Sequence, residues 1–270
     1  MIGPAERSWF AAAVARALRF YSRLPVPRLP QEARLEGRLD FASMALAVPV
    51  AGAVIGAMPA LALGLAHALG LGPEVAAIIA IACGVAVTGA LHEDGIADVA
   101  DGFFAGVDVE RRLEIMRDSR HGSFGVIAIV LVMLTRLALL AEFSTAGAGA
   151  AAAALIGAAA LSRIAGLMPL SLLPPARKDG IGAAAGSLPA EAFGRGTLAG
   201  CALMLLLALV GGFGMWRGIT ACLAALGASY GMCTLARARI GGQTGDVAGA
   251  AQIVAELAIY FALALGHGPQ

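Results

Sequence analysis

The stretch SFGVIAIVLVMLTRLALLAE, residues 123–142, is apolar along almost its whole length and contains two charged residues, Arg136 and Glu142. As an α-helix it is long enough to cross the hydrocarbon core of a bilayer, which takes about 20 residues. Comparable apolar runs lie near residues 44–69, 74–91, 148–172, 197–213, 218–236 and 247–265. The sequence therefore predicts an all-α, polytopic integral membrane bundle of about seven transmembrane helices, with the Gly/Ala-rich stretch 143–160 as the candidate for a bent or re-entrant helix.

The composition agrees with a protein that lies mostly in lipid. Of the 270 residues, 59% are hydrophobic and 14% are charged, whereas soluble domains are about half apolar and a quarter charged. The 36 glycines suit transmembrane helices that pack closely. A net charge of +1 gives no general attraction for nucleic acid, so the bilayer and not nucleic acid is the expected partner. The four cysteines show no C-x-x-C pairing and are expected to be reduced, packed thiols.

The N-terminal segment is predicted to lie at the membrane surface. A helix through RSWFAAAVARALRFY would collect one apolar face, made of Trp9, Phe10, Ala13, Val14, Ala17, Leu18 and Tyr21. This pattern is typical of an interfacial helix, and an ordinary helix packed on the bundle is the alternative. No cleavage site follows, so a signal peptide is not expected. We therefore expect one membrane-embedded domain over 1–270, with an interfacial helix and linker in 1–40 and the transmembrane bundle in 41–270.

Positive charge marks one face of this bundle. Of the 19 Lys and Arg residues, 16 fall in the N-terminal segment or in the stretches 92–122, 173–196 and 237–246. The alternate connections hold only Arg217. The positive-inside rule places the basic face in the cytoplasm of a bacterial inner membrane, with the C-terminus outside if the helices number seven. The polar motifs all fall on this face, so one multi-loop site facing the cytoplasm is expected.

The motif HEDGIADVADG contains the densest group of acids in the chain. Asp94, Asp98 and Asp101 are spaced i, i+4 and i+7, which aligns them on one stripe of a helix. Such carboxylates repel one another unless a cation lies between them, and oxygen ligands suit Mg²⁺ or Mn²⁺. The sequence therefore predicts that these three aspartates bind Mg²⁺ or Mn²⁺, with a solvated acidic helix end as the alternative. Glu93 lies off the stripe, either behind the metal ligands or in solvent, and His92 is expected to be structural.

Two further motifs on the same face favour binding of an anion. RRLEIMRDSRHG supplies Arg117, Asp118 and Arg120, and LLPPARKDGIG supplies Arg177. Guanidinium groups bind phosphate oxygens in a bidentate way, although a basic loop beside a membrane also satisfies the positive-inside rule or binds anionic lipid. Next to a metal site, these residues favour a phosphate or pyrophosphate substrate.

The motif GGQTGDVAG, residues 241–249, forms a Gly-rich turn before the last apolar run. Gly242, Thr244 and Gly245 are candidates for a nest of backbone N–H groups that binds an anion. Asp246 is a candidate to hold a metal or to orient a hydroxyl group. No G-K-[ST] follows, so this is not a Walker motif.

Together these motifs resemble the cobalamin synthase family, the membrane-bound adenosylcobinamide-GDP ribazoletransferases. The family core H-x-D-G-[LI]-A-D-x-x-D-G matches HEDGIADVADG. The similarity continues through FYSRLPVP, RRLEIMRDSRHGSFG, LLPPARKDGIG and GGQTGDVAGA, in the expected order over nearly the whole chain. The family often has Leu at the position of Glu93, which argues against an essential role for that acid.

The resemblance implies a Mg²⁺-dependent transferase. Adenosylcobinamide-GDP would react with α-ribazole, or with its 5′-phosphate, to give the cobalamin product and GMP. A ribose hydroxyl would attack the cobinamide-linked phosphate, and Asp101 or Asp246 would accept its proton. Mg²⁺ on the three aspartates would neutralise the leaving GMP, while Arg117, Arg120 and Arg177 would bind the phosphate oxygens. A homo-oligomer or a complex with other corrinoid enzymes is a further expectation.

Two other functions remain open from the residues alone. A CDP-alcohol phosphotransferase also uses clustered aspartates at the membrane edge, but this chain lacks the arginine and the later glycine that follow Asp-Gly in that signature. A cation-coupled transporter would place ionisable residues near the bilayer midplane. Here the acids are expected at a helix end, and only Arg136 and Arg163 are expected to lie deep.

Overall fold

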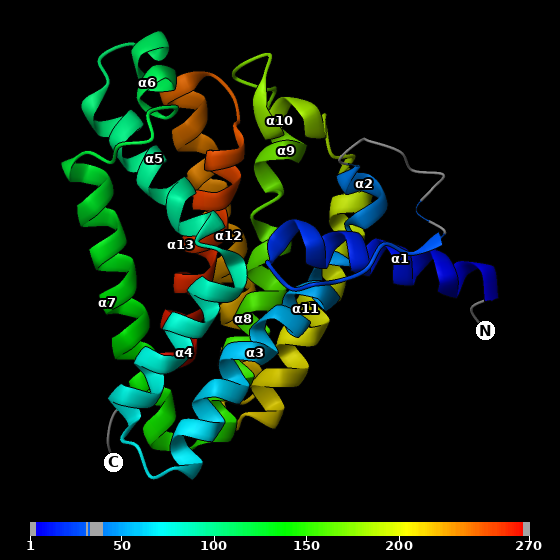
Figure 1. Cartoon of the computed structure of the whole chain (residues 1–270), viewed down its shortest axis with the longest axis vertical. Helices are drawn as coiled ribbons and strands as arrows, with labels where there is room; N and C mark the ends of the chain where they lie inside the picture. The colour runs from blue at the N-terminus through cyan, green and yellow to red at the C-terminus, as the bar shows by residue number, and fades with distance from the viewer. Residues whose placement is uncertain (1–3, 31, 33–39, 267–270) are drawn as a thin grey trace.

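The computed structural model describes residues 4–30, 32 and 40–266, and within these ranges the regular structure is helical with no β-strand (Figure 1). The long helices are α1 (Pro4–Tyr21), α3 (Val48–Ala68), α4 (Pro73–Thr88), α5 (Leu91–Ala105), α7 (Ser123–Ala146), α8 (Ala148–Ala165), α11 (Ala190–Val210), α12 (Met215–Ile240) and α13 (Gly245–Ala264). Short helices lie between them: α2 (Phe41–Met44), α6 (Val109–Ile115), α9 (Met168–Leu172) and α10 (Gly180–Ala185).

The expected number of membrane spans is confirmed. Six spans are long and apolar enough to cross a bilayer: α3, α7, α8 continued by α9, α11, α12 and α13. A seventh span is reached only if α4 and α5 are counted together as one broken span. These two helices are bent by 88° at the break between them.

The position of the bent helix was predicted wrongly. The stretch 143–160 instead forms a turn at Gly147 followed by the regular helix α8. The real bend lies at Gly89 and Ala90, which both have positive φ angles, +66° and +58°. Glycine adopts this left-handed conformation at little cost, and alanine adopts it with strain. The bend ends α4 and redirects the chain, so that α5 carries the acidic motif along the neighbouring helix α13.

The polar motifs gather at one end of the bundle, as expected. Figure 1 shows α5, α6, α9, α10 and the start of α13 at the upper end, and the C-terminus at the opposite end. Arg217 lies at that opposite end, where its guanidinium donates hydrogen bonds to the carbonyls of Leu265 and Gly266.

Helix α1 runs across the bundle instead of along it (Figure 1). Ala13, Ala17 and Tyr21 of its predicted apolar face are buried, whereas Trp9 at the far end of that face is 47% exposed. The buried part of this face packs on the bundle, as the alternative expectation has it, and a position of α1 at the membrane surface stays a prediction. The linker predicted to complete segment 1–40 falls largely in 33–39, which lies outside the described residues, as do Arg34 and Arg38 of the basic N-terminal segment.

Two glycines bring the acidic motif against the last helix. A Cβ at Gly95 would lie 3.0 Å from the carbonyl oxygen of Asp246, and the Cα atom of Gly95 lies 3.6 Å from a Cβ built at Gly249. Helices α5 and α13 therefore cross at the distance that small residues permit. This contact places the aspartates of α5 beside Asp246, which lies about 150 residues later in the chain.

Candidate active site

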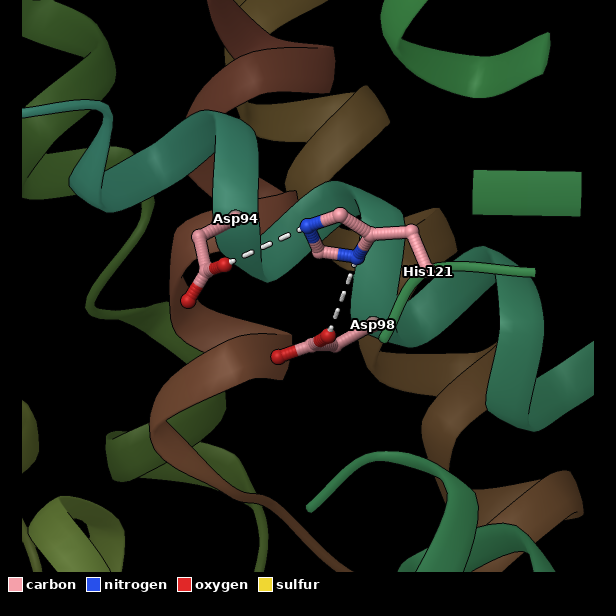
Figure 2. Close-up of side chains that lie close together, drawn as sticks. All are labelled: Asp94, Asp98 and His121. Atoms are coloured by element: carbon pink, nitrogen blue, oxygen red, sulfur yellow. Dashed lines mark ion pairs between the residues drawn. The ribbon is translucent and has the colours of Figure 1, made fainter. Parts of the chain in front are cut away.

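Two of the three stripe aspartates converge with a histidine. Oδ1 of Asp94 lies 3.8 Å from Nε2 of His121, and Oδ1 of Asp98 lies 3.8 Å from Nδ1 of the same ring. Figure 2 shows the imidazole between the two carboxylates. One ligand atom from each residue falls within 4.8 Å of the others. Carboxylate oxygens, with an imidazole beside them, form a donor set that fits Mg²⁺ or Mn²⁺.

Asp101 faces a different partner from the one predicted. Its carboxylate accepts hydrogen bonds from the backbone N–H groups of Gly122, at 2.6 Å, and Gly125, at 2.9 Å. Helix α7 begins at Ser123 without a side-chain cap of its own, so Asp101 of α5 satisfies N–H groups that the helix itself leaves free. Asp101 therefore does not join the Asp94, Asp98 and His121 group in this structure.

We expect Asp101→Ala to destabilise the fold. The substitution leaves two N–H groups at the start of α7 without an acceptor, which costs about 1–3 kcal/mol. Thermal unfolding of the detergent-purified protein would measure the loss. Asp101→Asn retains one acceptor oxygen, so this variant should lose less stability than Asp101→Ala. Equal stability of Asp101→Ala and wild type would contradict the capping role.

The two predicted loop motifs are hydrogen-bonded to each other. The backbone N–H of Gln243 donates to the carbonyl of Pro174 at 2.8 Å, and the N–H of Ala176 donates to the carbonyl of Gln243 at 2.9 Å. A Cβ at Gly242 would collide with the Pro174 carbonyl, so this close approach requires glycine. Gly242 thus joins the loops, and its proposed role in an anion nest remains a prediction.

Thr244 and Gly245 begin the last helix, as the sequence suggests. The Thr244 hydroxyl accepts a hydrogen bond from the N–H of Val247 and donates one to Asp246 at 3.1 Å. Thr244 is thereby a helix N-cap. Its second bond fixes the carboxylate of Asp246 at the end of α13 that faces α5.

The four predicted phosphate-binding side chains divide into two groups. Arg177 lies at the site, 3.3 Å from the Asp246 carboxylate, with a side chain that is 15% exposed. Arg117 and Arg120 are exposed, and pair with Asp179 at 2.5 Å and Asp118 at 2.8 Å. Hydrogen bonds from Arg120 lower the pKa of Asp118 to about 2, so Asp118 is an anion that orients Arg120.

A pocket of about 160 Å³ opens beside these groups. Its lining includes the charged side chains of Asp94, Asp246 and Arg177 and the aromatic side chains of Phe20 and Phe41. The lining also includes the buried Tyr21 and buried side chains from α5, α8 and α13. Sequence analysis did not predict this pocket, because α1 and α2 close it from a distant part of the chain.

Comparison with known proteins shows the family. A family model described as cobalamin-5-phosphate synthase matches residues 13–264. The chain belongs to this family. A protein of Azorhizobium caulinodans named adenosylcobinamide-GDP ribazoletransferase is 49% identical over 257 residues, which cover 94% of this chain and 95% of that protein. Proteins of the same name from Rhizobium etli and Brucella ovis are 43% and 39% identical, over 94% and 96% of this chain and 97% and 99% of their own lengths. No solved structure matches.

This cobalamin-5-phosphate synthase family member also has a buried ion cluster that the sequence did not reveal. Arg136 of α7 contacts Glu93 of α5 at 2.5 Å and Glu256 of α13 at 2.7 Å. Glu93 is 7% exposed, so it is not in solvent. The expectation that only Arg136 and Arg163 lie deep was therefore incomplete. His92 is buried, and its ring stacks on the ring of Tyr21 with centroids 5.8 Å apart, in agreement with a structural role.

His121 is the site residue that sequence reasoning missed. It precedes the start of α7 and is separated from Asp98 by more than 20 residues. Its proximity follows from the contact between Asp101 and Gly122, because this contact holds the start of α7 against α5. The glycine that follows His121 permits this approach, because a Cβ at Gly122 would lie 2.6 Å from Oδ1 of Asp101.

Proposed function

We propose that this chain joins adenosylcobinamide-GDP and α-ribazole, or its 5′-phosphate, to form a cobalamin and GMP. The observation that carries the proposal is the convergence of Asp94, Asp98, His121, Asp246 and Arg177 from four separate segments at one end of a membrane bundle. The match to the ribazoletransferases of other bacteria covers these segments. A CDP-alcohol phosphotransferase and a transporter are disfavoured by the same match.

The proposed metal is Mg²⁺, with Mn²⁺ as a substitute. Asp94 and Asp98 would hold it, with His121 beside them. When bound, the cation would supply charge neutralisation at the diphosphate. Asp101 is less suited to this role than the sequence suggested, because both of its carboxylate oxygens accept backbone hydrogen bonds.

The same hydrogen bonds favour Asp246 as the general base. A base must reach the proton that it removes and must be able to hold it. Asp246 lines the pocket, and its carboxylate is held there by Thr244 and Arg177. Arg177 lines the same pocket beside Asp246, so its guanidinium would bind a phosphate oxygen there. Arg117 and Arg120 would bind the exposed part of the donor.

We further propose that the site faces the cytoplasm of a bacterial inner membrane. Nine of the 19 Lys and Arg residues lie in the stretches 92–122, 173–196 and 237–246 at the end that carries the site, whereas Arg217 lies at the opposite end. Positive charge is retained on the cytoplasmic side. Homo-oligomers and complexes with other corrinoid enzymes remain predictions.

Turnover should depend on a divalent cation. Detergent-purified protein would be given adenosylcobinamide-GDP and α-ribazole 5′-phosphate, and GMP and the joined corrinoid would be quantified by mass spectrometry. We expect removal of metal by EDTA to reduce both products at least about a hundredfold, the effect of removing one electrostatic stabiliser from an active site. Added Mg²⁺ or Mn²⁺ should restore them, and Ca²⁺ should restore them less because it prefers longer bonds and more ligands. Full activity in EDTA would reject the metal site, and absence of both products with Mg²⁺ would reject the transferase.

A further inference from the structure

Two loops beside the active site are joined by an ion pair whose acid has no part in the proposed reaction. Nη2 of Arg117 lies 2.5 Å from Oδ1 of Asp179, and the two residues are 62 positions apart in the chain. Arg117 follows α6, and Asp179 directly precedes α10. Figure 1 shows both short helices at the end of the bundle where the polar motifs gather. The pair therefore connects two separate loops at the end that carries the site.

The loop that carries Asp179 also supplies a residue of the site. Arg177, two positions earlier, lies 3.3 Å from Asp246 and lines the pocket. Two residues of chain span at most about 7 Å between Cα atoms, so Asp179 lies close to this group. Gly180 has a φ angle of +85°, and a Cβ built there would lie 3.3 Å from Nε of Arg177. The loop therefore turns directly after Asp179 in a conformation that favours glycine.

The loop that carries Arg117 leads to the proposed metal site. His121, four positions later, lies 3.8 Å from the carboxylates of Asp94 and Asp98. Four residues of chain span at most about 14 Å. This position agrees with the role proposed for Arg117, which is to bind the diphosphate of the donor beside the metal.

The carboxylate of Asp179 is directed to Arg117 and not to its own helix. Asp179 is the residue before α10, with φ −122° and ψ 171°, and aspartate is among the residues that cap helices best. Its side chain nevertheless makes no capping hydrogen bond to the described start of α10. Asp108, at the same position before α6, does cap its helix, through the N–H of Arg111.

The ion pair occupies part of the guanidinium that a phosphate would need. A guanidinium binds phosphate through two neighbouring nitrogens, and Asp179 takes one of the terminal nitrogens of Arg117. A carboxylate held there also repels a second anion. The two side chains are 49% and 68% exposed, and exposed ion pairs contribute little to stability. The diphosphate of the donor can therefore displace the carboxylate.

The neighbouring pair of Arg120 and Asp118 differs in this respect. Asp118 is two positions from Arg120 and accepts hydrogen bonds from its backbone N–H and from its Nε and Nη2 atoms. Asp118 therefore stays beside Arg120 wherever the loop moves. Asp179 belongs to a different loop from Arg117, so the two side chains can separate when a ligand binds.

We propose that Asp179 occupies Arg117 until the diphosphate of the donor displaces it. Asp179 is thus a positioning residue that acts through Arg117 and lowers the affinity of the site for the donor. This inference rests on the proposed function, because it takes Arg117 as a ligand of the diphosphate. No covalent bond changes in the exchange: N–H groups of Arg117 bind phosphate oxygens, and the freed carboxylate binds water.

The test measures equilibrium binding of the donor to detergent-purified protein. Adenosylcobinamide-GDP would be titrated in the presence of Mg²⁺ and without acceptor, so that no product forms, and Kd would be obtained by calorimetry. The variants are Asp179→Asn, Arg117→Gln and the double variant. Glu191→Gln is the matched control, because Glu191 is also an exposed acid in an ion pair, with Arg195 of its own helix.

Asp179→Asn should bind the donor about two- to fivefold more tightly than wild type, which is the range that an exposed ion pair contributes. Asp179→Ala also removes the charge and should tighten binding by a similar factor. Arg117→Gln should weaken binding about tenfold, as expected for the loss of a hydrogen bond to a charged group. Added to Arg117→Gln, Asp179→Asn should change Kd no further, because the competing pair no longer exists. Glu191→Gln should match wild type.

Unchanged or weaker binding of the donor by both Asp179 variants would overturn the inference and leave the transferase function standing. An equal tightening by Glu191→Gln, or by Asp179→Asn in the Arg117→Gln background, would also overturn it, because the effect would then come from general electrostatics and not from competition for Arg117. Absence of donor binding by folded wild-type protein would instead reject the proposed function itself.

Discussion

Asp98→Asn should reduce turnover about a hundred- to a thousandfold, the usual effect of removing one electrostatic stabiliser from an active site. Oδ1 of Asp98 lies 3.8 Å from Nδ1 of His121, and the negative charges of Asp94 and Asp246 act on its carboxylate. Asparagine keeps the size of the side chain and removes the negative charge that a divalent cation requires. The loss should therefore appear in kcat for both acceptors, and the activity of the variant should respond less steeply to Mg²⁺.

The fold of Asp98→Asn should survive. The carboxylate interacts with the like charges of Asp94, Asp101 and Asp246, so its removal relieves repulsion. Asp108→Asn is the matched control, since Asp108 caps α6 through the N–H of Arg111 and asparagine caps a helix equally well. Loss of activity together with a lower unfolding temperature in Asp98→Asn alone would indicate a structural role and contradict the metal site.

The membrane architecture could be read from the sequence because each span carries its own signal. An apolar run of sufficient length has few alternatives to a transmembrane helix, and the charge distribution places the polar loops together. The bend at Ala90 could not be read in this way. Alanine strongly favours helix, so its left-handed conformation depends on the tertiary contacts around it.

Only part of the site could be predicted from the sequence, because contacts between helices also depend on tertiary packing. The helical stripe correctly grouped Asp94 with Asp98, which lie one turn apart on the same helix. It also grouped Asp101, but the start of α7 approaches α5 there and both carboxylate oxygens accept backbone hydrogen bonds. A role for Asp101 in metal binding therefore stays a prediction. His121 arrives with the same contact. Residues on one helix share a face by periodicity, whereas partners from another helix depend on packing.

The buried cluster of Glu93, Arg136 and Glu256 could not be predicted from the sequence either, because its members come from three different helices. Glu93 is next to Asp94 in sequence, but about 100° of helix rotation turns it away from the site and into the bundle. There it meets Arg136 from α7, and Glu256 from α13 completes the cluster. Three helices that carry or border the active site are thereby held together by one guanidinium, so the arrangement of the site depends on it.

Arg136→Gln is accordingly expected to cause the largest loss of stability. The substitution leaves Glu93 and Glu256 buried without their shared cation, and removing one partner from a buried ion pair costs about 3–5 kcal/mol. The variant should unfold at a markedly lower temperature in detergent than wild type, and activity should fall in proportion to the folded fraction.

The control for Arg136→Gln is the same substitution in an exposed ion pair. Arg195 and Glu191 are 3.4 Å apart on α11, with side chains 62% and 83% exposed. Arg195→Gln should change stability by less than about 0.5 kcal/mol, because exposed pairs contribute little. The double variant Arg136→Gln with Glu93→Gln should regain part of the lost stability, since it removes one of the stranded charges. If Arg136→Gln and Arg195→Gln unfold at the same temperature, the buried cluster does not hold α5, α7 and α13 together.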